Sequence, residues 1–219
     1  MPRYTAFLLM ALVVTPARAF GVTPVTSCGQ MVEGVGILQA DLDCTAFPGV
    51  AVTLANRSTL KLGGFTLTAN SGGVECFGTC RVLGPGTIGR AFPSVIGTDS
   101  CIGVTGVFGT RVTVRDVAFS QFGWAINSQE TARLARVTVT DGCFGVHTGR
   151  SVRIIDSTIT DNLGYGAHTF GRMTVIGSTI TGQLRDLWSP VPPRVRDSTC
   201  ITSNDDTSPL GIDFWNVCS

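Results

Sequence analysis

The stretch "DSTITDNLGYGAH" (Asp156–His168) decides the fold, because part of it returns shortly afterwards in the chain. The segment "STIT" occupies positions 157–160 and again positions 178–181. In both copies an isoleucine stands between two threonines, which is the alternation expected of a β-strand with one buried face. The repetition suggests that each copy is one rung of a coil.

The same triplet, an apolar residue between two polar residues, recurs along most of the chain. Its central residues are 20 or 21 positions apart at five steps, with one longer step of 31 and a first step of 25. Such a spacing is too short for a strand plus an ordinary helix, so the pattern predicts a solenoid of short strands. The central residues, which we expect to form one buried column, are Leu42, Leu67, Ile88, Phe119, Val139, Ile159, Ile180 and Cys200.

Other columns repeat in phase with the first. We expect a second buried column five positions upstream, in which Leu62 and Leu83 precede Val114 and its later equivalents. Glycines such as Gly145 and Gly166 recur near the expected corners, where we expect backbone conformations that a Cβ would penalise. With strands about 4.8 Å apart, eight rungs would form a rod roughly 38 Å long.

Four segments carry a resemblance to a known family. They are "VTVRDVAFSQFGWAI", "ARVTVTDGCFGVH", "IIDSTITDNLGYGAH" and "MTVIGSTITG". They resemble the repeats of the pectate-lyase-like superfamily, and Cys28–Cys44 resembles the Cys-flanked first strand of its secreted bacterial members. The resemblance implies an all-β fold, a right-handed single-stranded parallel β-helix of about 7–8 rungs with disulfide-linked ends. It leaves function open, because the superfamily includes lyases, hydrolases, adhesins and structural fibres.

The ends of the chain have their own signatures. Residues 1–19 have the layout of a secretory signal peptide, with Arg3 before an apolar run and small residues at Ala17 and Ala19. We therefore expect a secreted or periplasmic protein. The expected organisation is a single β-helix domain over 20–219, with an N-terminal cap over 28–57, rungs over 58–201, a loop insertion near 89–110 and a C-terminal cap over 202–219.

Eight cysteines in an exported chain predict disulfides. The positions of the cysteines in the chain favour two disulfide bonds, Cys28–Cys44 near the start and Cys200–Cys218 near the end. Cys76 and Cys80 are spaced to close a local turn, which would leave Cys101 with Cys143. A zinc site is the alternative for Cys76 and Cys80, but no second pair with similar spacing accompanies it.

The charge balance indicates neither a nucleic-acid partner nor an anionic membrane. The net charge is +1 and only 14% of residues are charged, which gives no electrostatic footprint for nucleic acid. After the predicted signal peptide no apolar segment is long enough to span a membrane. We expect a monomer whose partner is a polysaccharide or a cell-surface glycan.

Two pairs of side chains are candidates for catalysis. Asp141 and Asp161 stand at equivalent positions of adjacent repeats, and so do His147 and His168. Stacked on adjacent rungs, the pairs could supply acid–base chemistry or bind a cation. The alternatives are that each aspartate caps a turn and that each histidine is a repeated surface residue. We expect no metal site and no cofactor, with calcium only if the protein is an enzyme.

Aromatic residues near one corner are candidates for ligand binding. They would form a strip on which sugars stack, or would cover the corner. These residues are Trp124, Phe144, Tyr165 and Trp188.

The expected function is therefore a non-catalytic binding or structural module for extended polysaccharide at the cell surface. The alternative is a polysaccharide lyase or glycoside hydrolase of pectate-lyase-like type, for which the sequence shows no larger cluster of acids. Ice binding through repeated T-x-T triplets is less favoured, because "TIG" (87–89) and "AFS" (118–120) interrupt the array.

Overall fold

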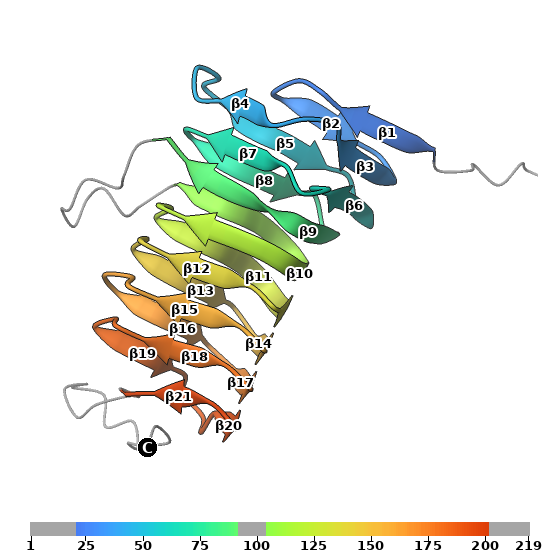
Figure 1. The fold of residues 1–219 in the computed structure, drawn as a ribbon. Helices are drawn as coiled ribbons and strands as arrows, with labels where there is room; N and C mark the ends of the chain where they lie inside the picture. Colours follow the sequence, from blue (N-terminus) through green and yellow to red (C-terminus); the bar gives the residue numbers. More distant parts are fainter. Residues whose placement is uncertain (1–20, 92–103, 202–219) are drawn as a thin grey trace, which may run out of the picture.

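The structure, a computed structural model, describes residues 21–91 and 104–201. These residues form a parallel β-solenoid of about 8 turns and contain no helix, which confirms the predicted fold class (Figure 1). Their strand pairings are parallel, and each strand pairs with its equivalent in the next rung. The predicted signal peptide, the core of the predicted loop insertion and the predicted C-terminal cap lie outside the described residues.

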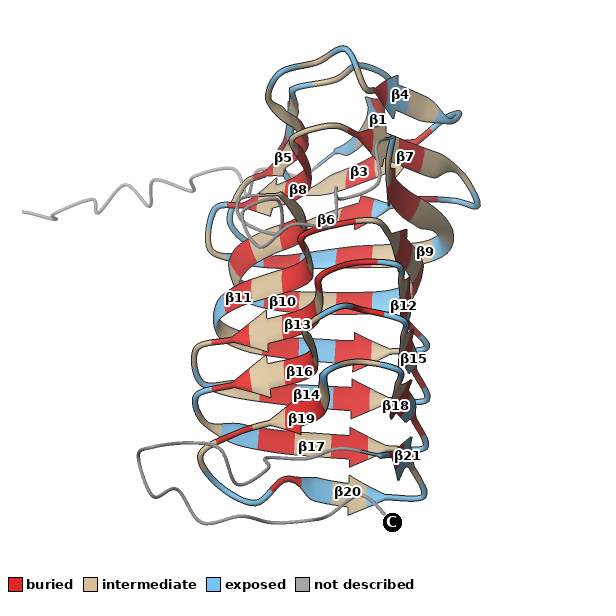
Figure 2. Ribbon diagram, turned by 90° about the vertical axis from the view of Figure 1, so that its left-hand side faces the viewer, coloured by how far each residue is buried: buried red, intermediate tan, exposed pale blue. Residues whose placement is uncertain are grey.

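Each rung passes through three faces, which Figure 2 shows as three columns of stacked strands. The long strands β9, β10 and β11 continue around corners, so hydrogen bonding links the faces into one 21-stranded sheet. We name the faces after the side chains that they carry outward: the threonine face, the aromatic face and the arginine face.

The threonine face carries the repeated triplets. Its strands are β4 (Leu42–Cys44), β7 (Thr66–Ala69), the last parts of β9 (Thr79–Arg90) and β10 (Thr105–Ser120), β12 (Thr138–Thr140), β15 (Thr158–Thr160), β18 (Thr179–Thr181) and β21 (Thr199–Cys200).

The aromatic face follows the next corner. Its strands are β2 (Gln30–Val32), β5 (Val50–Leu54), β8 (Gly72–Cys76), the first parts of β10 and of β11 (Trp124–Ala135), β13 (Phe144–Thr148), β16 (Tyr165–Thr169) and β19 (Arg185–Trp188).

The arginine face closes the rung. Its strands are β1 (Val22–Val25), β3 (Val35–Leu38), β6 (Ser58–Lys61), the first part of β9, the middle of β10, the last part of β11, β14 (Ser151–Ile155), β17 (Arg172–Ile176) and β20 (Arg194–Arg196).

The predicted first column is in register at every step, and it is buried from Leu67 onward, while Leu42 is half-buried. Leu42 pairs with Leu67, Ile88 with Phe119, and the series continues through Ile159 to Ile180 and Cys200. Leu67, Ile88, Val139, Ile159 and Ile180 are fully buried. Their threonine neighbours point outward, and uninterrupted T-x-T triplets occupy β12, β15 and β18.

The predicted second buried column is wrong in two rungs. The in-register residues are Leu60 and Val82, followed by Val114, rather than Leu62 and Leu83. The corner before the threonine face is longer in these rungs, because Gly63-Gly64 and Gly84-Pro85-Gly86 add residues there. The spacing of five residues between the two buried columns therefore does not hold in rungs with a longer corner.

The corners explain the aspartates of the repeat. One corner column has positive φ at Asp116, Arg136, Asp156, Gly177 and Asp197, with values from 47° to 59°. Apart from glycine, the residues that most readily adopt this left-handed conformation are aspartate and asparagine. Arg136 is the exception, and it forms an ion pair with Asp116.

A serine column follows the same corner inside the coil. Ser157 Oγ accepts a hydrogen bond from the N–H of Val137 and donates one to the carbonyl of Ile155. Ser178 Oγ bonds the N–H of Ser157 and the carbonyl of Ile176 in the same way. The buried corner therefore keeps its backbone groups paired, which gives a reason for the serine that begins "STIT" in both copies.

Gly145 and Gly166 do not have the role expected of them. They lie inside β13 and β16 without positive φ, so close packing rather than backbone conformation requires glycine. A Cβ on Gly145 would lie 2.4 Å from the carbonyl oxygen of Gly166 and 2.6 Å from Cγ2 of Ile159. These glycines let the wall of the aromatic face approach the buried isoleucine column.

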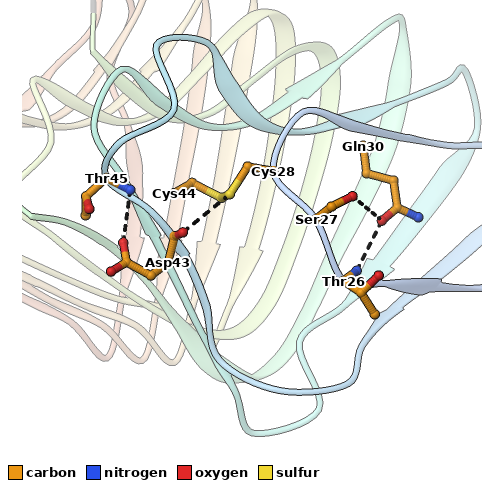
Figure 3. Close-up of a disulfide and its surroundings, with 7 residues drawn as sticks. All are labelled: Thr26, Ser27, Cys28, Gln30, Asp43, Cys44 and Thr45. Atoms are coloured by element: carbon orange, nitrogen blue, oxygen red, sulfur yellow. Dashed lines mark hydrogen bonds between the residues drawn. A yellow bond between two sulfur atoms is a disulfide. The ribbon is translucent and has the colours of Figure 1, made fainter.

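Disulfides link the N-terminal part of the coil. The predicted Cys28–Cys44 bond is confirmed and joins the turn after β1 to β4 (Figure 3). Cys76 and Cys80 are also bonded to each other, so the zinc alternative for them is wrong. Cys143 and Cys200 are disulfide-bonded too, while their predicted partners, Cys101 and Cys218, lie outside the described residues. No helix in the described ranges is long and apolar enough to cross a membrane.

Close packing of the glycine column predicts a large effect from one methyl group. Gly145→Ala should lower the free energy of unfolding by about 1–3 kcal/mol, because the added Cβ overlaps backbone that has no room to shift. Urea unfolding of Gly145→Ala and Gly89→Ala gives the comparison. At Gly89 the nearest atom to an added Cβ is Ser120 Oγ at 3.5 Å, so that variant should be close to the parent. Equal stability of all three proteins would contradict this account of Gly145.

Removing the Cys28–Cys44 bond should also destabilise the fold. The bond closes a sequence separation of 16 residues, which corresponds to about 3 kcal/mol in the chain-entropy model. The double variant Cys28→Ala/Cys44→Ala should therefore melt about 6–12 °C lower. The pair Cys76→Ala/Cys80→Ala is the control with a shorter loop and a smaller expected loss. An unchanged melting midpoint in the first variant would show that the bond does not hold the N-terminal end.

Candidate functional site

The aromatic face brings three of the predicted ligand-binding residues into one outward column. Trp124 pairs with Phe144 between β11 and β13, and Tyr165 continues the column in β16. The ring centroids of Trp124 and Phe144 are 4.4 Å apart, and those of Phe144 and Tyr165 are 5.9 Å apart. Both contacts are stacked, so the rings turn their faces toward one another along the coil axis.

The histidines form the neighbouring outward column. His147 pairs with His168 in register, and their ring centroids are 4.9 Å apart. Asn127 precedes them and Trp188 follows them in the same column. The structure therefore brings the two histidines together with the fourth predicted aromatic residue, Trp188, whose ring centroid lies 4.3 Å from that of His168.

One aromatic residue of this site was missed by sequence reasoning. Phe170 lies just after β16, is 58% exposed, and contacts the rings of His147, His168 and Trp188 at 4.9–5.8 Å. These contacts are perpendicular or nearly so, which leaves more ring surface open than in the stacked column. No repeated column indicated Phe170, because its equivalent in the preceding rung is a glycine, Gly149.

The two imidazoles are neutral at pH 7. Burial lowers the pKa of His147, and burial together with the nearby His147 lowers the pKa of His168 to about 4. Nδ1 of His147 lies 3.1 Å from Oδ1 of Asn127, an atom that only accepts hydrogen bonds. With Oδ1 of Asn127 as the acceptor, this contact corresponds to the tautomer of His147 that carries its proton on Nδ1 and leaves Nε2 as an acceptor.

The aspartate candidates do not join the histidines. Asp141 and Asp161 stand at the corner between the threonine and aromatic faces, in a left-handed column with Gln121 and Gly182. Their φ values of 56° and 57° give a conformational reason for aspartate at this place. No carboxylate contributes to the shifted pKa values of His147 or His168. The described ranges also contain no cluster of three or more His, Cys, Asp or Glu side chains that could hold a metal.

This arrangement offers an amphipathic surface whose histidines are uncharged at pH 7, with Arg185 next to Tyr165 in the same outward column. A general base works best when its pKa is near the operating pH, and a pKa of about 4 makes His168 a weak base. Five aromatic side chains lie beside Asn127, His147 and His168 on this face: Trp124, Phe144, Tyr165, Phe170 and Trp188. We call this set the aromatic site.

The arginine face is a second feature that composition did not reveal. Its outward positions carry exposed arginines on successive rungs, although the whole chain has a net charge of only +1. Aligning the third strand of each rung, for example "RLAR" (133–136) with "RIID" (153–156), would have indicated it. The arginines in question are Arg81, Arg115, Arg133, Arg153, Arg172 and Arg194.

Comparisons with known proteins identify no relative: no family model, curated protein or solved structure matches this chain. Its function is therefore argued from its own residues.

The lowered pKa values predict a characteristic pH dependence. The Cε1–H resonance of His168 should titrate with a pKa of about 4, and that of His147 below the usual 6.5. Since folding lowers these values, the unfolded chain binds more protons below pH 6.5. Stability should therefore be full above pH 6.5 and fall as the pH drops toward 4, and His168→Gln should weaken this dependence. A His168 midpoint near 6.5 in the NMR titration would contradict the proposed burial.

Proposed function

We propose that this protein is a non-catalytic binding module for extended polysaccharide outside the cytoplasm, and that the aromatic site is its binding surface. The observation that carries the proposal is a continuous set of ring contacts over four successive rungs, with centroid distances from 4.3 to 5.9 Å. Such an array extends along the coil axis for about 14 Å. It is long and narrow, as a site for an extended polymer must be.

The chemistry of the aromatic site suits sugars. Pyranose rings have apolar C–H faces that pack on aromatic surfaces, and hydroxyl groups that require hydrogen-bonding partners. Phe170 and Trp188 would provide the apolar contact. The Tyr165 hydroxyl and Nε2 of His147 would provide polar contacts beside it. Because the imidazoles are neutral at pH 7, the site favours uncharged sugar units.

The location is consistent with this role. Disulfide bonds persist in oxidising environments, and six cysteines within the described residues are disulfide-bonded. An extracellular or periplasmic β-solenoid exposes its faces directly to surface glycans. The predicted signal peptide, the secreted location and the resemblance to the pectate-lyase-like superfamily remain predictions from the sequence.

The enzyme alternative rests on weaker features. A lyase or hydrolase needs clustered acids, with calcium in some cases, or an acid–base pair with suitable pKa values. The candidate aspartates stand at left-handed corners, and the candidate histidines have lowered pKa values. These features favour binding without catalysis.

Removal of the most exposed ring is the direct test of binding. Phe170→Ala should lower affinity for a neutral polysaccharide about tenfold or more, because a central aromatic contact is lost. Affinity electrophoresis through gels containing different neutral plant and bacterial polysaccharides provides the measurement. Thr158→Ala on the threonine face, also an exposed position, should leave affinity unchanged. The proposal fails if no polysaccharide retards the parent protein, or if Phe170→Ala is retarded equally.

Catalysis is tested separately. The purified protein should release no product from polyuronate or related glycans, with or without calcium, when reducing ends and unsaturated products are followed. Cleavage that disappears in Asp161→Asn would overturn the non-catalytic assignment and make that corner an active site.

A further inference from the structure

The arginine face presents at least one exposed arginine on each of six successive rungs, and β10 and β20 each carry a second one, Arg111 and Arg196. Register places Arg81, Arg133 and Arg153 in one outward column, with Arg194 two rungs beyond Arg153. Arg115 and Arg172 fill the intervening rungs, two positions to either side of that column. The positive charges therefore follow the coil axis at intervals of about 4.8 Å in rung spacing.

None of these six arginines forms an ion pair within residues 21–91 and 104–201. Two other arginines do form ion pairs: Arg111, in the register column of Arg172, pairs with Glu130, and Arg136 pairs with Asp116 at the corner. The outward positions of β6, β14, β17 and β20 carry no carboxylate. A row of unpaired like charges opposes folding by mutual repulsion, so its presence on one face calls for an anionic partner.

The face is also hollowed beside three of these arginines. A hollow of about 370 Å³ is lined by Arg115, Arg133 and Arg153 together with Ala135 and Ile155. Ala135 pairs with Arg115 on one side and with Ile155 on the other. The smallest of these three stacked side chains therefore lies at the centre of the hollow. Three guanidinium groups thus border a space with an apolar floor.

We propose that the arginine face binds a linear anionic polysaccharide along the coil axis, with one sulfate or carboxylate group seated in the hollow above Ala135. The planar fork of arginine pairs with the oxygens of both groups through two parallel hydrogen bonds. Outward hydroxyls such as Thr113, Thr131 and Thr174 lie between the arginines and supply donors for sugar oxygens. The apolar side chains of Ala135 and Ile155 contact the C–H faces of the sugar.

A row of arginines could also attract nucleic acid through charge. The other side chains of the face, however, do not suit nucleic acid. Single-stranded nucleic acid binds through aromatic side chains on which bases stack. No aromatic residue stands at an outward position of β6, β9, β11, β14, β17 or β20 on this face. A polymer without bases therefore fits the face better.

This site is independent of the aromatic site. The two occupy different faces of the coil, and one is lined by arginines while the side chains that form the other are uncharged at pH 7. Failure of either proposal leaves the other standing, provided that neutral and anionic ligands are tested separately.

The probes are dextran sulfate, carboxymethyl dextran, unmodified dextran and a poly(dT) oligonucleotide. Binding to the full-length protein is measured by calorimetry at 0.05 M and 0.5 M salt. We expect binding to dextran sulfate, carboxymethyl dextran or both, no heat with dextran, and a steep loss of affinity at the higher salt concentration.

Three variants distinguish specific binding at the hollow from nonspecific electrostatic attraction to the whole protein. Arg133→Gln/Arg153→Gln should weaken binding about tenfold or more, because two charge-assisted contacts at the hollow are lost. Ala135→Leu keeps every charge but fills the hollow, and it should also weaken binding. Arg185→Gln removes one positive charge from the aromatic face and should have no effect.

The outcomes are decisive in both directions. Binding that follows the expected order of probes and variants supports the site. The proposal is overturned if neither anionic dextran binds, if Arg185→Gln is as damaging as the double variant, or if Ala135→Leu binds as the parent does. Tighter binding of poly(dT) than of both anionic dextrans would make nucleic acid the partner instead.

Discussion

The in-register parallel pairing of successive rungs is the constraint on which the rest of this structure depends. Because each residue pairs with its equivalent one rung away, any preference at one position is repeated about 4.8 Å further along the axis. Ile159 pairs with Ile180 inside the coil, while Thr158 pairs with Thr179 outside it. Corners obey the same rule, as the left-handed aspartates and the serine column show. A single interruption, such as a Cβ at Gly145, would act on two rungs at once.

The same constraint sorts chemistry into faces. Rings accumulate on one face, threonines on the second and arginines on the third, so the surface consists of three long stripes of different character. A net charge of +1 therefore says little about this molecule, because opposite charges are not evenly mixed over its surface. Two stripes have the shape of sites for extended polymers, one neutral and one cationic.

The sequence predicted the buried column, the threonine triplets and the Cys28–Cys44 bond because each depends on local alternation or chain separation. The prediction of the second buried column was wrong where the corner length varies, because Gly63-Gly64 and Gly84-Pro85-Gly86 shift that column. The interpretation of the sequence also attributed Gly145 to backbone conformation, although only three-dimensional packing shows the carbonyl of Gly166 close to it.

The candidate site was predicted in part for the same reason. Trp124, Phe144 and the two histidines repeat at the rung spacing, so alignment of the repeats is enough to bring them together. Phe170 does not repeat, and the lowered pKa of His168 depends on burial by rings from several rungs. The roles first considered for Asp141 and Asp161 remain predictions, while their left-handed φ values give a structural reason for their identity.

The central claim is that a neutral polysaccharide contacts the outward columns of the aromatic face and the adjoining Phe170, and not the corner that carries Asp141 and Asp161. Backbone amide shifts of isotopically labelled protein, recorded while a bound neutral polysaccharide is added, test it most directly. The account predicts shifts confined to the first part of β11, to β13, β16 and β19, and to Phe170, so that they recur on four successive rungs. Shifts centred on Asp141 and Asp161, or spread evenly over all three faces, would contradict it.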